Sequence, residues 1–248
     1  MARTALLGRL TWQAADVVEV VAETPRVKTI VLDVPGWHGH RTGQHVDVRL
    51  TAEDGYQAQR SYSIASAPDA SRLELTVERL EEGEVSPYLT DELRPGDQIE
   101  LRGPVGGYFV WVPEQGGPLL LVAGGSGVVP LMAMIRLHAA AGSDDDTRLL
   151  FSSRSWDDII YRDELSQLNG GSRTIVHTLT RTRPPGWTGY ARRVDAEMLA
   201  EVGPSPVERP HVYVCGPTPF VEAVAEALVG LGHEPHAIKT ERFGPTGG

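Results

Sequence analysis

Arg60-Ser61-Tyr62-Ser63 places an arginine, an aromatic ring and two hydroxyls within four residues. In a β-strand, Arg60 and Tyr62 share one face and the two serines share the other. An arginine fork can bind a diphosphate through two hydrogen bonds, a tyrosine ring can lie against a flat ligand, and the Ser63 hydroxyl can donate to a ring nitrogen. An ordinary strand with a surface arginine and a half-buried tyrosine is the alternative, and this segment alone leaves it open.

Three other segments contain small residues that allow a ligand to approach the backbone. Gly83-Glu84-Val85-Ser86 precedes an expected short helix and could bind a second phosphate, with a tight turn as the alternative. Gly124-Gly125-Ser126-Gly127 joins an apolar run to an expected helix and is typical of a nucleotide-binding loop, although its spacing is not GxGxxG. Cys215-Gly216-Pro217 follows another apolar run, where the thiol could line a nicotinamide pocket; a buried structural cysteine is the alternative.

The N-terminal half has the pattern of short β-strands separated by turn residues. Strands at this spacing predict an antiparallel Greek-key β-barrel. One short helix is expected to interrupt the barrel at residues 86–93, with Ser86 as its N-cap and Pro87 at its first position. The predicted strands are residues 17–22, 27–34, 44–50, 57–66, 73–80 and 98–102.

The pattern changes after the proline- and glycine-rich segment 113–118, so a domain boundary is expected there. Apolar strands then alternate with helices, which predicts right-handed βαβ units and a parallel sheet that binds its ligands at the carboxyl ends of its strands. The predicted fold class is α+β with two domains, 1–113 and 114–248. The predicted strands are 119–123, 148–151, 174–178, 211–214 and 236–240, and the helices are 129–141, 162–168, 195–201 and 219–231.

The residues after the second and third strands of the C-terminal half favour a phosphorylated ribose. An NAD-binding fold commonly has an acidic residue after its second strand, whereas this chain has Ser153 and Arg154. Arg181, after the next strand, adds positive charge. The sequence therefore favours NADPH over NADH. Exposed arginines in surface loops are common and form the alternative.

Composition and charge argue against several classes of protein. The net charge of −10 argues against general binding of nucleic acid or anionic membranes. No apolar run approaches the roughly 20 residues of a membrane span. The single cysteine excludes an internal disulfide and a four-thiolate iron–sulfur cluster within these residues. Residues 1–8 have too short an apolar stretch for a secretory leader, so we expect a cytoplasmic protein.

The order of the three motifs resembles the ferredoxin–NADP reductase superfamily over nearly the whole chain, particularly the bacterial branch that supplies electrons to oxygenases. The resemblance implies FAD on the barrel and NADPH, or NADH, on the α/β domain. Arg60 would hold the FAD diphosphate, Tyr62 would stack on the isoalloxazine, and Ser63 would hydrogen-bond its reactive nitrogen. Ile64 and Ala65 would continue the wall of the ring site.

The same resemblance implies roles for further segments. Val77-Glu78-Arg79 would contact the flavin through its backbone. Glu241, near the end of the last strand, would orient the nicotinamide or relay a proton, and Phe243 would shield a ring face. Ser63, Cys215 and Glu241 are the candidate catalytic residues. The candidate cofactor-binding residues are Arg60, Ser61, Tyr62, Ser63, Ile64, Val77, Glu78, Arg79, Gly83, Val85, Ser86, Gly124, Gly125, Ser126, Gly127, Ser153, Arg154, Arg181, Cys215, Gly216, Pro217 and Phe243.

The expected activity is that of a flavin-dependent reductase. Hydride would pass from NAD(P)H to FAD, and single electrons would then pass to a separate acceptor protein: a ferredoxin, a flavodoxin or an oxygenase component. Many relatives carry a fused iron–sulfur domain, which one cysteine cannot supply here. The open alternatives are a non-catalytic electron-transfer or redox-sensing subunit and a free-flavin or ferric reductase. Some relatives use FMN, so FAD depends on Arg60 together with the Gly83 and Ser86 segment.

Overall fold

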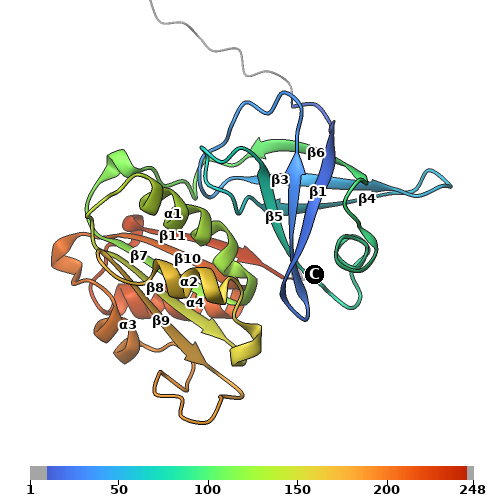
Figure 1. The fold of residues 1–248 in the computed structure, drawn as a ribbon. Helices are drawn as coiled ribbons and strands as arrows, with labels where there is room; N and C mark the ends of the chain where they lie inside the picture. Colours follow the sequence, from blue (N-terminus) through green and yellow to red (C-terminus); the bar gives the residue numbers. More distant parts are fainter. Residues whose placement is uncertain (1–9, 245–248) are drawn as a thin grey trace, which may run out of the picture.

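The computed structural model describes residues 10–244 and contains two sheets that lie side by side (Figure 1). We call the N-terminal sheet and its connections the barrel part, and the C-terminal sheet with its helices the α/β part. The segment 1–8 and the end of the C-terminal tail lie outside the described residues. No helix within the described residues is both long and apolar enough to cross a bilayer.

The barrel part is a six-stranded antiparallel sheet, as predicted. Its strand order is β4-β3-β6-β1-β2-β5. The two outer strands approach each other through a bridge between Ile64 and Leu75, which curls the sheet toward a barrel. Its strands are β1 (Gln13–Thr24), β2 (Val27–Asp33), β3 (His45–Thr51), β4 (Gln57–Ser63), β5 (Leu73–Glu78) and β6 (Gln98–Val105).

Alternation of side chains along the strands builds the barrel core. In β5, for example, Leu73, Leu75 and Val77 are at most 2% exposed and pack into one apolar cluster with side chains of β2, β3 and β6. Residues at alternate positions of a strand lie on one face, so the intervening residues of β5 point away from this core. Each of these intervening residues contacts the α/β part.

The α/β part is a five-stranded parallel sheet in the order β11-β10-β7-β8-β9, which confirms the predicted class. The continuous apolar run of β7 is explained by helices on both faces of the sheet. Leu119 and Leu121 pack with α1 and α2, whereas Leu120 and Val122 pack with α3 and α4. The strands are β7 (Leu119–Gly124), β8 (Thr147–Ser153), β9 (Arg173–Leu179), β10 (His211–Pro217) and β11 (Ile238–Phe243); the helices are α1 (Val128–Ala140), α2 (Arg162–Leu168), α3 (Ala196–Val202) and α4 (Thr218–Gly230).

The short helix of the barrel part differs in detail from the prediction. The structure has a helical segment at Tyr88–Glu92 with Pro87 before it, and no side chain caps it. The Ser86 hydroxyl instead accepts a hydrogen bond from the Leu80 amide, at 3.1 Å. The prediction of Ser86 as an N-cap was wrong, because this hydroxyl closes the preceding turn.

The two parts share an apolar and polar contact surface. Val27 and Ala65 of the barrel part belong to the same buried cluster as α1, β7 and β8. The Tyr213 hydroxyl of β10 donates to the Val110 carbonyl at 2.8 Å. The Tyr213 ring also packs edge-on against Phe109, with centroids 5.2 Å apart. These contacts fix the α/β part against the segment that follows β6.

Candidate functional site

The carboxyl ends of β7 and β10 form the centre of the candidate site. These two strands are neighbours, but the chain leaves β7 toward β8 and β9 on one side, whereas β10 continues to β11 on the other. Connections that diverge in this way leave a crevice at the strand ends, where α/β sheets bind ligands. Gly124 ends β7, and Cys215-Gly216-Pro217 ends β10, so the fold brings these two motifs together.

The two motifs touch through their backbones. A Cβ placed on Gly127 would lie 2.2 Å from the Cys215 carbonyl oxygen, so only glycine fits there. A Cβ on Gly124 or Gly216 would lie 2.9 or 2.6 Å from the ring of Phe220. Phe220, in the first turn of α4, therefore fills the space between both glycines. We did not predict it; an aromatic residue three positions after Pro217 is the signal that could have found it.

The glycine loop also reaches the barrel part. The Ser126 hydroxyl donates to Glu78 Oε2 at 2.7 Å. Glu78 ends β5, the strand that was expected to contact flavin through its backbone. Two segments that were assigned separately to the nucleotide and to the flavin are thus in direct contact.

The last strand places an acidic residue beside the cysteine. In the parallel pairing of β10 and β11, Cys215 is opposite Glu241 and Pro217 is opposite Phe243. Although Glu241 as a whole is half-buried, its Oε2 atom is shielded from solvent and has no hydrogen-bond partner among the described residues. Burial raises the pKa of Glu241 to about 7.

Cys215 is 2% exposed, and burial, together with the nearby Glu241 carboxylate, raises its thiol pKa well above the ordinary value. The thiol is therefore neutral near pH 7, which disfavours a thiolate nucleophile at this position. What Cys215 offers is a small, polarizable surface at the end of β10.

Arg60 and Tyr62 lie on the same strand of the barrel part, as expected. The Arg60 guanidinium is 52% exposed and forms an ion pair of 2.9 Å with Glu84. The Tyr56 hydroxyl also donates to Glu84, at 2.7 Å. Tyr62 is half-buried against the barrel core, and burial raises its pKa to about 12, so it stays a neutral phenol. Ser63 is half-buried at the last position of β4.

Several residues predicted to bind a cofactor use their side chains within the protein. Ser61 donates to Asp47 at 2.7 Å, and Arg79 pairs with Asp91 at 2.8 Å and with Glu81. Such residues can offer a ligand little beyond their backbone groups. Four aliphatic side chains among the predicted residues are fully buried, at 0% exposure: Ile64, Ala65, Val77 and Val85.

The expected 2′-phosphate residues lie at the ends of β8 and β9. Ser153 is 4% exposed, and within residues 10–244 its hydroxyl has no hydrogen-bond partner. The amide of Arg181 donates to the carbonyl of Arg154 at 2.8 Å, so the two loops that carry these arginines are joined. Both arginines are exposed. Trp156 and Trp187 pack edge to face beside these loops, with centroids 5.7 Å apart.

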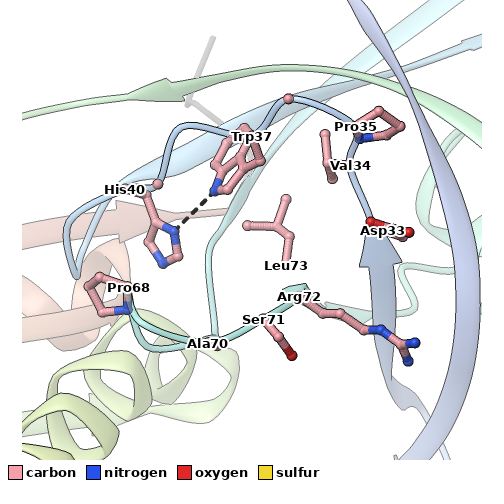
Figure 2. Close-up of a pocket in the computed structure, with 12 residues that line it drawn as sticks. Asp33, Val34, Pro35, Trp37, His40, Pro68, Ala70, Ser71, Arg72 and Leu73 are labelled. Atoms are coloured by element: carbon pink, nitrogen blue, oxygen red, sulfur yellow. Dashed lines mark hydrogen bonds between the residues drawn. The ribbon is translucent and has the colours of Figure 1, made fainter.

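A separate hollow of about 320 Å³ lies between the β2–β3 and β4–β5 connections (Figure 2). The Trp37 indole N–H points at His40 Nδ1 from 3.4 Å, and His40 Nε2 lies 3.0 Å from the Ser66 carbonyl. This arrangement requires a neutral His40 protonated on Nε2, and burial lowers its pKa accordingly. None of the residues predicted from the sequence lines this hollow.

Comparison with known proteins agrees with this geometry. Residues 15–110 match the family described as oxidoreductase FAD-binding domain, and residues 121–226 match oxidoreductase NAD-binding domain. Ferredoxin–NADP reductase B of Sorangium cellulosum is 40% identical over 208 residues, which are 81% of this chain and 84% of that protein. A glycine betaine monooxygenase reductase subunit of Pseudomonas aeruginosa is 33% identical over 92% of this chain. The chain spans 63% of that relative's length.

Solved structures share the fold. The flavohaemoglobin-like FAD/NAD-binding domain of a nitric oxide dioxygenase from Vibrio cholerae has a TM-score of 0.84 at 25% identity, with 94% of this chain and 99% of that chain covered. A cytochrome P450 reductase from Amycolatopsis has a TM-score of 0.82 at 27% identity, with 95% and 71% covered. The chain belongs to the ferredoxin–NADP reductase superfamily of oxidoreductases that bind FAD and a nicotinamide nucleotide.

The residues present fit these two cofactors. Two of the buried polar atoms without a partner are Glu241 Oε2 and Ser153 Oγ, and both belong to residues expected to face the nicotinamide nucleotide. A buried polar atom without a partner is costly, and a ligand that hydrogen-bonds it removes that cost. The Arg60 fork is open to solvent on the barrel side, as a diphosphate ligand requires.

Proposed function

We propose that this protein is an NAD(P)H-dependent FAD oxidoreductase that passes electrons to a separate acceptor protein. The observation that carries this function is the contact between Ser126 and Glu78, because it joins the nucleotide loop to the flavin strand. Two cofactors held on these segments would meet at the ends of β7 and β10. FAD, when bound, accepts a hydride and releases its electrons singly.

The protein's own contribution is binding and orientation. Arg60 would exchange Glu84 for the diphosphate, and Tyr62 would support the flavin ring. Ser63 would donate a hydrogen bond to that ring. Fixing two reactants in a productive arrangement removes much of the entropic barrier to their reaction. Cys215 and Phe243 would line the nicotinamide side, and Glu241 would hold or release a proton near neutral pH, as its raised pKa of about 7 supports.

We further propose NADPH as the preferred donor. Arg154 and Arg181 are exposed and carried on joined loops, and Ser153 offers an unpartnered hydroxyl beside them. Arginine forks suit the geometry of a phosphate group. Replacing both arginines by Ala would weaken the binding of NADPH about tenfold or more, because only NADPH carries the 2′-phosphate. The affinity for NADH would stay nearly unchanged.

The acceptor is proposed to be a ferredoxin, a flavodoxin or an oxygenase component. Two relatives support this class: one is named a ferredoxin–NADP reductase, and another is named a monooxygenase reductase subunit. We place the protein in the cytoplasm and the boundary between its domains at residues 113 and 114. The segment Pro113–Gln115, between the two sheets, supports that boundary.

The test is the visible spectrum of the purified protein, recorded without oxygen before and after addition of NADPH and then NADH. A flavin spectrum that bleaches faster with NADPH supports both the activity and the donor preference. Equal or faster bleaching with NADH contradicts the proposed phosphate site. Protein that stays colourless after incubation with FAD contradicts the function itself.

The matched variants separate these outcomes. The double variant Arg154→Ala, Arg181→Ala should lose the preference for NADPH. Arg72→Ala removes another exposed arginine, on the barrel part, and should keep the preference. If both variants lose the preference for NADPH to the same extent, the general loss of positive charge explains the effect, and a specific phosphate site does not.

A further inference from the structure

Strand β5 has two faces with different partners. Leu73, Leu75 and Val77 face the barrel core. Glu74, Thr76 and Glu78 alternate with them, so these three share the opposite face. Thr76 is 5% exposed, although it is polar. A buried polar face on a strand requires hydrogen-bond partners from neighbouring elements, and the α/β part supplies one to each of these three residues.

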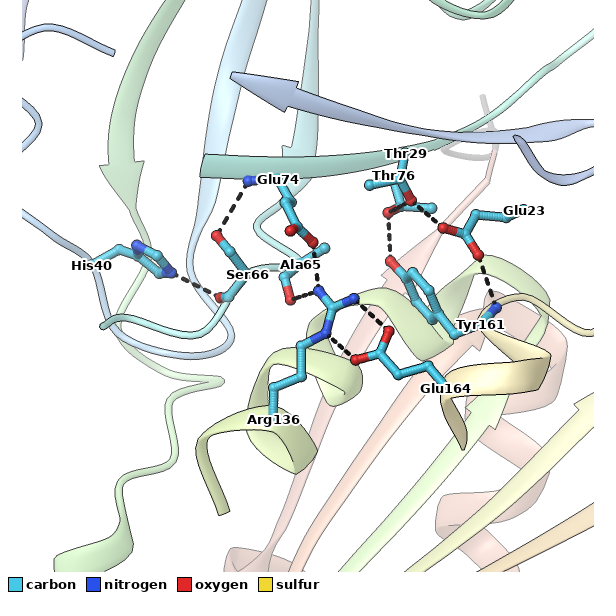
Figure 3. Close-up of polar contacts among 10 residues, drawn as sticks. All are labelled: Glu23, Thr29, His40, Ala65, Ser66, Glu74, Thr76, Arg136, Tyr161 and Glu164. Carbon is cyan, nitrogen blue, oxygen red and sulfur yellow. Dashed lines mark hydrogen bonds and ion pairs between the residues drawn. The ribbon is translucent and has the colours of Figure 1, made fainter. Parts of the chain in front are cut away.

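Each of the three residues contacts a different element of the α/β part. Glu74 pairs with Arg136 of α1 at 2.7 Å. Thr76 accepts from the hydroxyl of Tyr161, which precedes α2. Glu78 accepts from Ser126 of the glycine loop at 2.7 Å. Figure 3 shows the first two of these contacts, and we call the three together the β5 ladder.

Arg136 makes the most extensive of these contacts. Its Nε and Nη2 donate to the two oxygens of Glu164 at 2.8 and 2.7 Å, which is a bidentate pair. Its Nη1 donates to Glu74 Oε2 at 2.7 Å and to the Ala65 carbonyl at 2.9 Å (Figure 3). The side chain is 18% exposed. A planar guanidinium that makes four hydrogen bonds has one orientation. Arg136 therefore fixes how α1 lies relative to Glu74 and Ala65, in addition to supplying a positive charge.

Tyr161 closes a cyclic set of hydrogen bonds. Its hydroxyl donates to Thr76, which donates to Thr29 at 2.8 Å, which donates to Glu23 Oε1 at 2.7 Å. The other oxygen of Glu23 accepts the Tyr161 amide at 3.3 Å (Figure 3). Tyr161 has a left-handed backbone conformation, with φ of 58°, which costs a non-glycine residue about 1 kcal/mol. This strained conformation occurs where Tyr161 hydrogen-bonds Thr76 and Glu23 of the barrel part.

Helix α1 connects the two halves of the candidate site. It begins at Val128, directly after the glycine loop, and carries Arg136 two turns later. The Arg136 fork holds the carbonyl of Ala65, two residues after Ser63. One rigid helix therefore reaches from the nucleotide loop to the flavin segment.

We propose that Arg136 is a positioning residue that, through the β5 ladder, sets how the α/β part sits on the barrel part and thereby the separation of the two ring sites. The consequence for hydride transfer rests on the proposed function. The consequence for the placement of the two parts does not.

The placement is tested first, without cofactors. Nitroxide labels on Glu53→Cys of the barrel part and Glu222→Cys of α4 report the distance between the parts, since both positions are exposed and the native Cys215 is buried. The distance distribution should be narrow in the otherwise unchanged chain and clearly broader or shifted with Arg136→Lys. Glu74→Gln, which keeps the fork to Glu164, is the milder second variant should Arg136→Lys not fold.

Arg148→Lys is the matched control. Arg148 pairs with Asp146 at 2.7 Å and donates to two carbonyls, those of Val202 and Gly203, all within the α/β part. Its loss should destabilise the protein without changing the distance between the labels. If Arg136→Lys and Glu74→Gln leave the distribution as narrow as Arg148→Lys does, the proposal is overturned and these residues serve stability alone.

The kinetic arm uses the FAD-loaded protein. At saturating NADPH, Arg136→Lys should slow flavin bleaching about tenfold or more, because misplacement of reacting groups costs rate rather than affinity. FAD retention and the KM for NADPH should change less than about twofold. An unchanged bleaching rate together with a broadened distance distribution overturns the link to catalysis. Failure of the unsubstituted protein to bleach overturns the proposed function and leaves the distance result to stand by itself.

Discussion

At the scale of single residues, close contact decides what each position tolerates. Gly127 and Cys215 were predicted to bind a nicotinamide nucleotide, and the structure adds that their backbones touch. The glycine in this loop is required by that contact, whatever its role toward a ligand. Arg60, in contrast, is free to change partner, because its ion pair with Glu84 is half-exposed and exposed pairs contribute at most about 1 kcal/mol.

Gly127→Ala should destabilise the protein by about 3 kcal/mol, because overpacking against backbone atoms cannot be relieved by a rotamer change. The new Cβ would lie 2.2 Å from the Cys215 oxygen and 2.7 Å from the Gly216 nitrogen. Thermal unfolding should show a Tm lower by roughly 6–12 °C. Gly230→Ala, in the last turn of α4 with open space around it, should be neutral or stabilising. A Gly127→Ala protein as stable as the parent would disprove the contact.

At the scale of elements, the strand and helix pattern could be predicted and the polar contacts could not. Helix α2 has the predicted bounds, and β7 differs from its prediction by one residue, because apolar periodicity is a local property of the sequence. The alternation of β5 was also visible, but not that its polar face would be buried. Ser86 does not cap the helix because its hydroxyl accepts a hydrogen bond from the Leu80 amide in the preceding turn.

Thr76→Val and Tyr161→Phe should each destabilise the protein by about 1–3 kcal/mol, since each leaves a buried hydroxyl without its partner. Both substitutions keep the size of the side chain. In urea unfolding, the double variant should lose about 1 kcal/mol less than the sum of the single losses. Strict additivity would mean that the two hydroxyls do not interact.

At the scale of the whole molecule, the contacts between the two parts escaped prediction for one physical reason. Arg136 meets Glu74 and Ala65, which lie 62 and 71 residues away along the chain. No local pattern specifies such partners, because they depend on how two independently patterned sheets dock. The motifs themselves could be assigned, since each lies within a few consecutive residues.

Two partly buried groups with opposite pKa shifts should make stability depend on pH in a characteristic way. Burial raises the pKa of Glu241 to about 7. The contribution of Glu241 to the free energy of unfolding is therefore present below pH 4.5 and is lost as pH rises through 7. Burial lowers the pKa of His177 to about 4, so its contribution is present above pH 6.5 and is lost as pH falls through 4. The two effects oppose each other between pH 4.5 and 6.5.

Single variants should reveal how each of the two groups makes the free energy of unfolding depend on pH, measured on protein without cofactors. Glu241→Gln should gain about 2 kcal/mol relative to the parent at pH 8, because no buried carboxylate has to ionise. His177→Phe should remove the loss of stability toward acid, by a similar amount at pH 4.5. Chemical denaturation at a series of pH values measures both. Parallel pH curves for parent and variants would show that neither group titrates differently on folding.

The polar face of β5 also decides which residues must be exchanged together when the halves of two such reductases are joined in a chimera. A chimera that joins this barrel to a foreign α/β half at residue 113 would leave Glu74, Thr76 and Glu78 opposite side chains that never adapted to them. The exchangeable module is therefore the α/β half together with three positions of a strand that belongs, by sequence, to the other half. Grafts that transfer those positions should assemble, whereas grafts cut only at the linker should yield two folded halves that meet in no fixed register.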